Sequence, residues 1–177
     1  MNTVALSGAP NAGKTTLFNW LTGSKYKAVN YPGSTVDFYT GNTLNLYQAD
    51  FNIIDTPGTY SLAAKTPEEE VTIKVLFNDN FANKPEATIV VVDGTQLARH
   101  LALAKQIINC GYPTVIAITM ADLLKKENCQ LHIENIQQEL GAPVVLVDGQ
   151  LGGGVKELIL KLKSIIGIKN KIEMRTW

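Results

Sequence analysis

The chain has 177 residues, of which 45% are hydrophobic and 18% charged, and its 16 basic side chains balance 16 acidic ones. This composition is typical of one compact α/β domain and excludes a disordered chain. The zero net charge argues against nucleic acid as a partner, because no overall basic field attracts a polyanion. There is no signal sequence and no apolar run of membrane-spanning length, so we expect a cytoplasmic protein with two reduced cysteines, Cys110 and Cys129.

Strand and helix patterns alternate along the chain, which predicts a doubly wound α/β sheet with its ligand at the carboxyl ends of the strands. Residues 25–38 lack clean periodicity and are expected to form a long mobile loop. Thr66 is expected to cap the helix that Pro67 begins, with Glu69 completing a capping box. The expected elements are strand 4–7, helix 14–21, hairpin strands 40–46 and 51–54, helix 67–77, strand 87–92, helix 97–110, strand 115–118, helix 132–140, strand 143–147 and helix 155–166.

No repeat, low-complexity stretch or linker divides the chain. We therefore expect one domain over residues 1–166. Residues 167–177 are expected to be a C-terminal tail, or the start of a following region.

Residues 8–15 form a complete phosphate-loop motif, G-x-x-x-x-G-K-[ST], between a predicted strand and a predicted helix. Its glycines let the backbone turn N–H groups toward phosphate oxygens at the helix N-terminus. Lys14 supplies a positive charge to the β- and γ-phosphates, and the Thr15 hydroxyl is a ligand for Mg²⁺. We expect nucleotide contacts from Gly8, Ala9, Pro10, Asn11, Ala12, Gly13, Lys14, Thr15 and Thr16.

A second motif, Asp-Thr-Pro-Gly at residues 55–58, ends a hydrophobic strand. There the Asp55 carboxylate can hold a water on the magnesium ion, and the Gly58 N–H can meet the γ-phosphate. Thr35 lies in the loop between the two motifs and is the candidate for a second magnesium hydroxyl. Lys14, Thr35 and Gly58 are therefore expected to act in cleaving the γ-phosphate.

These motifs resemble the cytoplasmic G domain of the bacterial ferrous-iron transporter B family (FeoB). The likeness extends over residues 1–166, and its most specific parts are Asn-Tyr-Pro-Gly-Ser-Thr at 30–35 and Thr-Tyr-Ser-Leu at 59–62. The resemblance implies a Ras-like P-loop NTPase with a mostly parallel central sheet flanked by helices. It also implies GTP hydrolysis and a role in regulating or powering ferrous iron uptake. The implied partners are GTP or GDP, the membrane domain of a longer parent chain and a second G domain.

The sequence departs from that family where the base is read. The family's Asn-x-x-Asp becomes Thr119-Met120-Ala121-Asp122, and Thr119 lacks the amide that would tie this loop to the phosphate loop and to guanine. Asp122 can still accept from guanine N1 and N2. The last base-contacting loop contains Asp148, Gly149 and Gln150 instead of a Ser-Ala-like pair, and a backbone N–H of Gly149 or Gln150 could reach O6. A lost contact costs roughly 1–3 kcal/mol, so we expect softened guanine selectivity and some use of ATP.

Catalysis needs positive charge at the transferred phosphoryl group. Thr59 and Tyr60 follow Gly58 and offer none, and Arg99 and Arg175 are not expected to reach the phosphates. In potassium-activated relatives, the asparagine that Asn11 matches helps to bind K⁺; an ordinary turn residue is an equally weighted interpretation. The cofactors are therefore expected to be Mg²⁺ and, through Asn11, K⁺.

Two alternatives stay open at this point. One is a ribosome-assembly GTPase similar to Era, and the other is a nucleotide-binding regulatory module with relaxed base specificity and slow turnover.

Overall fold

The structure is a computed structural model that describes residues 1–126 and 130–175, without the side chains of Lys125 and of residues 168–175. Cys129 and the Arg175 side chain therefore lie outside the described part, whereas Cys110 is an exposed free thiol. The element order is β1 (Asn2–Gly8), α1 (Lys14–Thr22), β2 (Lys27–Asn30), β3 (Asp37–Asn42), η1 (Asn45–Tyr47), β4 (Phe51–Asp55), α2 (Pro67–Phe77), β5 (Ala87–Asp93), η2 (Gly94–Gln96), α3 (Leu97–Asn109), β6 (Thr114–Thr119), α4 (Ala121–Lys126), α5 (Ile133–Leu140), β7 (Val144–Leu146) and α6 (Val155–Arg175).

The strands form one sheet in the order β2-β3-β4-β1-β5-β6-β7 within the described residues. From β4 to β7 neighbouring strands are parallel, and β2 and β3 add an antiparallel edge. The strand order reverses direction at β1, between β4 and β5. The phosphate loop follows β1 at this switch point, which is where open α/β sheets bind ligands.

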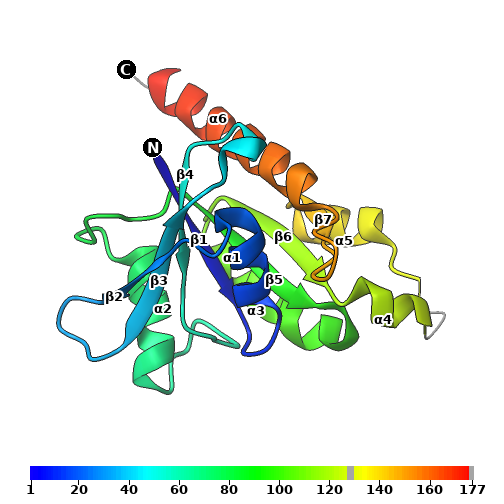
Figure 1. Ribbon diagram of the computed structural model, residues 1–177, viewed down its shortest axis with the longest axis horizontal. Coiled ribbons are helices and arrows are strands. Elements are labelled where there is room, and N and C mark those ends of the chain that lie inside the picture. Colours follow the sequence, from blue (N-terminus) through cyan, green and yellow to red (C-terminus); the bar gives the residue numbers. More distant parts are fainter. Residues whose placement is uncertain (127–129, 176–177) are drawn as a thin grey trace.

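Helices cover both faces of the sheet (Figure 1). On one face α1 and α6 bury Leu17, Phe18 and Leu158 against alternate residues of β1, β5 and β6. On the other face α3 packs Leu103 and Ile107 against the remaining residues of the same strands. Strand β5 is buried along its whole length because both of its faces are covered.

The structure corrects the sequence-based elements at four places. Residues 25–38 are not a loop throughout, because β2 and the start of β3 pair as an antiparallel hairpin. The first strand of the next hairpin ends at Asn42 instead of residue 46, and η1 follows it. The short helix α4 was not predicted. Helix α6 runs to Arg175 instead of ending at 166, because the residues after Gly167 are mostly good helix formers.

The start of α2 confirms the predicted cap with one change. Thr66 Oγ1 accepts a hydrogen bond from the Glu69 N–H at 3.3 Å, and Pro67 occupies the first turn. The Glu69 carboxylate, however, accepts from the Lys65 N–H at 2.8 Å instead of from the N–H of the cap residue. None of the described helices combines the length and the apolar character needed to cross a membrane.

Candidate nucleotide-binding site

The phosphate loop leaves β1 and enters α1 through backbone conformations that need glycine at two positions. Gly8 has φ +149°, and a Cβ there would collide with the carbonyl oxygen of Val91 on the neighbouring strand. Gly13 caps α1 with φ +91°. Between them Asn11, also left-handed at φ 62°, has an exposed side chain. The loop thus presents the N-terminus of α1 at the strand end, as the motif predicts.

Lys14, Thr15 and Asp55 lie together beside this loop. The Thr15 hydroxyl donates to Asp55 Oδ2 at 3.2 Å, which brings the last residue of β4 to the first turn of α1. Burial raises the pKa of the Asp55 carboxyl, and the nearby Lys14 charge and the Thr15 hydrogen bond act in the opposite direction. Burial also lowers the pKa of Lys14, against the attraction of Asp55. The site therefore holds two partly desolvated opposite charges.

These residues fit a magnesium ion. Asp55 Oδ1 is buried and has no hydrogen-bond partner among the described residues, so it is free to accept from a metal-bound water. The neighbouring Thr15 supplies a hydroxyl oxygen, and oxygen donors of these two kinds are the ligands that Mg²⁺ prefers. Mg²⁺ bound by so few protein groups usually keeps several waters and takes phosphate oxygens as further ligands.

Gly58 is held close to the phosphate loop from both sides. Thr56 donates its N–H and its hydroxyl to the carbonyl oxygen of Leu6, at 3.2 and 2.7 Å. The Thr59 N–H donates to the carbonyl oxygen of Gly8 at 3.0 Å. A Cβ on Gly58 would lie 2.8 Å from the Pro10 nitrogen, so the close approach requires glycine. The predicted neighbourhood of Gly58 and the phosphate loop is present.

Thr35 is not brought to this site. It is exposed in the loop between β2 and β3, which is closed by a hydrogen bond of 3.2 Å from the Tyr31 N–H to the Val36 carbonyl. Figure 1 shows this loop at the outer edge of the sheet, away from the phosphate loop. Tyr31 anchors it there, stacked on Phe81 with ring centroids 5.4 Å apart. The role of Thr35 as a magnesium ligand stays a prediction.

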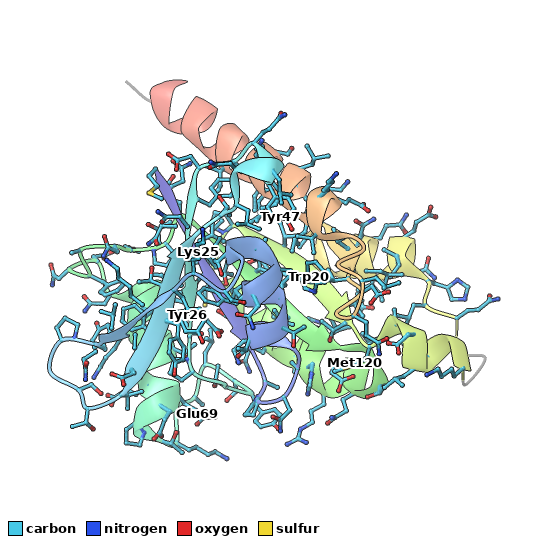
Figure 2. The ribbon with its side chains drawn as sticks, viewed as in Figure 1. Trp20, Lys25, Tyr26, Tyr47, Glu69 and Met120 are labelled. Atoms are coloured by element: carbon cyan, nitrogen blue, oxygen red, sulfur yellow. The ribbon has the colours of Figure 1, made fainter. Side chains whose placement is uncertain are left out.

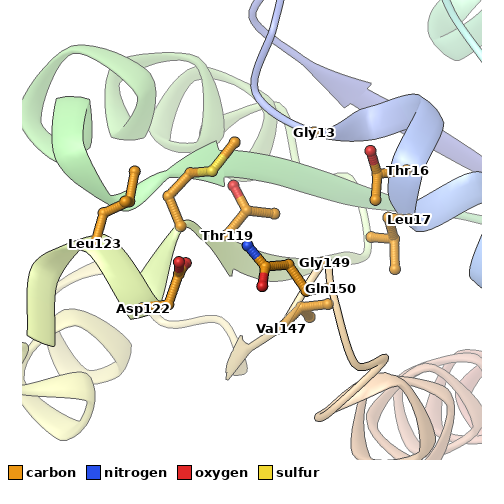
Figure 3. A pocket seen from close by; sticks show the side chains of 10 residues that line it. Gly13, Thr16, Leu17, Thr119, Asp122, Leu123, Val147, Gly149 and Gln150 are labelled. Carbon is orange, nitrogen blue, oxygen red and sulfur yellow. The ribbon is translucent and has the colours of Figure 1, made fainter.

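A cavity of about 280 Å³ lies next to the phosphate loop, where a base would follow the phosphates (Figure 3). Its walls come from α1, from the end of β6 with α4, and from the loop between β7 and α6. Seven residues predicted to contact the nucleotide line it, and so do three apolar residues that were not predicted. The first group is Gly13, Thr16, Thr119, Met120, Asp122, Gly149 and Gln150, and the second is Leu17, Leu123 and Val147.

Thr119, at the end of β6, connects the segment expected to read the base with the phosphate loop. This contact corrects the expectation from sequence. The Thr119 hydroxyl donates to the carbonyl oxygen of Ala12 at 2.8 Å. A Cβ on Gly13 would lie 3.3 Å from the Thr119 methyl group, so the two loops are in close contact. The hydroxyl replaces the amide in holding the loops together, although it lacks the second group with which an amide could also contact guanine.

Asp148 is predicted as a nucleotide contact, but it is absent from the lining of the cavity as the structure describes it. Its Oδ1 accepts instead from the N–H groups of Gln150 and Leu151, at 2.8 and 3.0 Å. The carboxylate is therefore used inside its own loop.

Trp20 holds the loop that contributes Gly149 to the cavity lining. Its indole N–H donates to the Gly149 carbonyl oxygen at 2.9 Å, and its own carbonyl accepts from the Tyr47 hydroxyl at 3.0 Å. Figure 2 shows Trp20 on α1 with Tyr47 close by. A Cβ on Gly152 would lie 2.8 Å from the indole ring. A helix residue thus fixes a loop 129 positions later, a contact that no local pattern could reveal.

Arg99 contacts the segment after Gly58 instead of the phosphate loop. Its guanidinium lies 4.1 Å from the centre of the Tyr60 ring. His100 is buried beside the same ring, and its Nδ1 accepts from the Asp93 N–H at 3.1 Å. His100 is thus packed in the interior. Among the residues that the structure describes, no group of three or more His, Cys, Asp or Glu side chains could hold a metal ion.

A family model described as ferrous iron transport protein B matches residues 2–162. The chain belongs to this family. An Fe(2+) transporter FeoB of Leptospira biflexa is 36% identical over 174 residues, which cover 98% of this chain and 25% of that protein. The chain thus spans about a quarter of the length of the curated FeoB relatives it matches.

Solved FeoB structures share the fold. The G domain of the T. maritima FeoB iron transporter matches with a TM-score of 0.81 and 35% identity, over 93% of this chain and 98% of that one. A mutant of S. thermophilus NFeoB bound to GDP.AlF4⁻ matches with a TM-score of 0.81 and 33% identity, over 94% of this chain and 64% of that one. The fold is that of a Ras-like P-loop NTPase, and the sequence-based fold class is confirmed.

Proposed function

We propose that this domain is a Mg²⁺-dependent GTP-binding and GTP-hydrolysing switch. In the longer parent chain it would lie at the cytoplasmic face of the membrane and regulate or power ferrous iron uptake through an attached membrane domain. The observation that carries the proposal is the contact of Thr15 with Asp55 beside Lys14, within a complete phosphate loop. The GDP.AlF4⁻ bound to the S. thermophilus relative supports it, because that complex carries a phosphate-like group next to GDP.

Each residue of the site has a defined task in this proposal. The backbone N–H groups of the phosphate loop and the Lys14 ammonium would hold the β- and γ-phosphates, and the Gly58 N–H would meet the γ-phosphate. Thr15 directly, and Asp55 through a water, would hold a magnesium ion. A magnesium ion held there would supply positive charge to the phosphates.

The switch would consist of the segments on either side of Asp55. Thr35 would reach the site when the γ-phosphate is present, and residues 56–65 would be held through Gly58. Hydrolysis would release both segments and so change the surface offered to the membrane domain or to a second G domain. Nucleic acid is not among the proposed partners.

A potassium ion bound with the help of Asn11 is the proposed source of further positive charge. The Asn11 side chain is exposed in the phosphate loop, where its carbonyl oxygen is available to a large, weakly hydrated cation. Arg99 is engaged with Tyr60, which supports the view that it does not serve the phosphates.

A second candidate is a nucleotide-binding regulatory module that turns over slowly and accepts ATP as well as GTP. Thr119 favours this candidate, because its hydroxyl contacts Ala12 and its side chain has no amide group that could also contact the base. Family membership favours both candidates over the ribosome-assembly alternative.

Turnover of Lys14→Ala tests the proposal. Multiple-turnover phosphate release from GTP with Mg²⁺ should be nearly abolished, since Lys14 supplies the direct positive contact to the phosphates. Circular dichroism should show a folded domain. Lys25→Ala is the matched control, because Lys25 is an exposed lysine outside the phosphate loop. Wild-type turnover in a folded Lys14→Ala protein would refute phosphoryl transfer at this site, and slow wild-type turnover would favour the regulatory module.

A further inference from the structure

The segment that follows Gly58 is attached to helix α3 at two points. The Arg99 guanidinium lies over the Tyr60 ring, 4.1 Å from its centre, and Arg99 takes part in no salt bridge among the described residues. Two residues after Tyr60, the Leu62 N–H donates to Gln106 Oε1 at 2.7 Å. The two α3 side chains are seven positions apart in the helix, so they lie on one face of it, about two turns from each other.

The phosphate loop holds the other side of the same segment. The Thr59 N–H donates to the Gly8 carbonyl oxygen at 3.0 Å, and Thr59 is buried. Tyr60 packs against the core cluster that includes Ala9 and Ala12 of the phosphate loop. The segment is therefore fixed between the phosphate loop and α3. Each of these contacts joins two protein groups, so none of them requires a nucleotide.

This double attachment fixes the backbone that carries the Gly58 N–H. Gly58 directly precedes Thr59 and Tyr60, and a Cβ on it would lie 2.8 Å from the Pro10 nitrogen. A donor that is already in place binds its ligand without the free-energy cost of ordering the segment around it. The α3 contacts therefore lower the cost of presenting the Gly58 N–H to a γ-phosphate.

We propose that Arg99 and Gln106 are positioning residues, which hold the segment after Gly58 in the arrangement that a γ-phosphate requires. Neither side chain contacts the phosphates, and both act through the segment. The inference rests on the proposed function, because it takes the Gly58 N–H to be the contact with the γ-phosphate. GDP has no γ-phosphate, so the α3 contacts favour the binding of a triphosphate and leave the binding of GDP unaffected.

Binding of GMPPNP and GDP with Mg²⁺ to variants of the 177-residue chain, measured by isothermal titration calorimetry, tests the inference. Arg99→Ala and Tyr60→Leu each remove the contact of cation and ring, and each should weaken GMPPNP binding about two- to fivefold with GDP binding unchanged. The double variant should lose no more than either single variant, because both remove the same contact. Tyr60→Phe is the matched control, since it keeps the ring under the guanidinium, and it should bind both nucleotides like the wild type.

Gln106 provides an independent arm of the test. Gln106→Ala removes the acceptor of the Leu62 N–H, so GMPPNP binding should weaken by about two- to tenfold, again with GDP binding unchanged. Gln106→Glu keeps an acceptor oxygen at the same reach and should stay near the wild type.

Trypsin distinguishes this role from a general contribution to the fold. Lys65 is exposed near the end of the segment. In nucleotide-free protein, cleavage after Lys65 should be about twofold faster or more in Arg99→Ala and in Gln106→Ala, because a segment released from α3 enters the protease more readily. Cleavage after Lys25, an exposed lysine outside the segment, should keep its wild-type rate.

Three results would overturn the inference. These are equal weakening of GMPPNP and GDP binding in the α3 variants, wild-type binding of GMPPNP in both Arg99→Ala and Gln106→Ala, and equal acceleration of cleavage after Lys65 and after Lys25. If the wild-type chain does not bind GMPPNP, the proposed function itself fails and the inference fails with it. If the wild-type chain binds both nucleotides and the variants leave their affinity ratio unaltered, only the inference is removed.

Discussion

The Thr119 hydroxyl links the cavity beside α1 to the phosphate loop through the carbonyl oxygen of Ala12 at 2.8 Å, and it shares its proton with the more distant carbonyl oxygen of Val92 on β5, at 3.2 Å. All three groups are buried, so their hydrogen bonds are not replaced by water when one is lost. We therefore expect the Thr119 hydroxyl to contribute more than the shape of the side chain to holding the two segments together.

Thr119→Val keeps the shape and removes the hydroxyl. We expect it to weaken GDP and ADP binding equally, by about threefold to tenfold, because it loosens the loop without touching the base. Thr119→Asn adds an amide and should raise the GDP-to-ADP affinity ratio. Competition titrations measure both. A strict preference for GDP in the natural chain, unaltered by Thr119→Asn, would contradict the second expectation.

Asn11 is the residue through which we expect K⁺ to accelerate hydrolysis. GTP turnover in KCl should exceed turnover in NaCl of equal ionic strength by about tenfold or more, since charge at the transferred phosphoryl group acts on the transition state. Asn11→Ala should flatten this difference and leave Mg²⁺-nucleotide binding largely intact. Equal rates in the two salts for the natural chain would leave Asn11 as an ordinary turn residue.

At the scale of elements, the hairpin of β2 and β3 is the part that must rearrange for Thr35 to reach the phosphates. Its tip is held by the Tyr31–Phe81 stack and by a hydrogen bond of 2.8 Å from Asn78 to the Tyr31 hydroxyl. We therefore expect the rearrangement to occur only when the γ-phosphate and its metal ion provide new contacts.

Thr35→Ala should weaken binding of GMPPNP by roughly threefold to tenfold and leave GDP binding nearly unchanged. The reason is that we expect Thr35 to contact the site only in the triphosphate state. Isothermal titration calorimetry with the two nucleotides provides the comparison. Equal losses for GDP and GMPPNP would instead indicate a general effect on the fold.

Helix α3 is attached to β5 through His100, whose Nδ1 must be unprotonated to accept from the Asp93 N–H. Burial lowers the pKa of His100, and the Arg99 charge acts in the same direction while Asp93 opposes it. The folded pKa thus lies below the unfolded value of about 6.5. The resulting stability is present above that pH and is lost as the pH falls through the folded pKa.

His100→Asn keeps an acceptor near the Asp93 N–H but cannot titrate. We expect its melting temperature to fall less than that of the wild type between pH 7.5 and pH 5, as measured by circular dichroism. His132→Asn, which replaces the other histidine, should follow the wild-type profile. A wild-type slope in His100→Asn would show that the acid sensitivity comes from another group.

For the whole molecule, the open question is where the G domain ends. The core contacts of α6 run from Val155 to Ile166, and a Cβ at Gly167 would meet nothing within 4 Å. The helix nevertheless continues to Arg175. The domain boundary at residue 166 stays a prediction that a truncation can test.

A chain ending at Gly167 should melt within about 2 °C of the full chain, because less than about 0.5 kcal/mol of stability is expected to be lost. Thermal unfolding followed by circular dichroism measures the difference, and GDP affinity should be unchanged. A markedly lower melting temperature would place residues 168–177 within the domain.

The sequence by itself determined the parts of this protein that depend on local backbone geometry. The phosphate loop needs glycine at Gly8 and Gly13 and a lysine at the helix start, so its motif predicts both its shape and its place. The position of Asp55 at a strand end and the cap at Thr66 follow from equally local patterns. These features predicted the fold class, which is confirmed, and the residues that we propose to bind the phosphates and Mg²⁺.

Only the tertiary structure decided how the cavity between α1, the end of β6 and the loop after β7 is built. Thr119 meets Ala12 across 107 positions, and Trp20 meets Gly149 across 129, and neither contact leaves a periodic trace in the sequence. The pairing of β2 with β3 was equally hidden, because the four residues of β2 are all exposed and show no apolar alternation. Asp148 has the right type and place to touch a base, but its choice of the Gln150 N–H is made by the turn that the folded chain imposes.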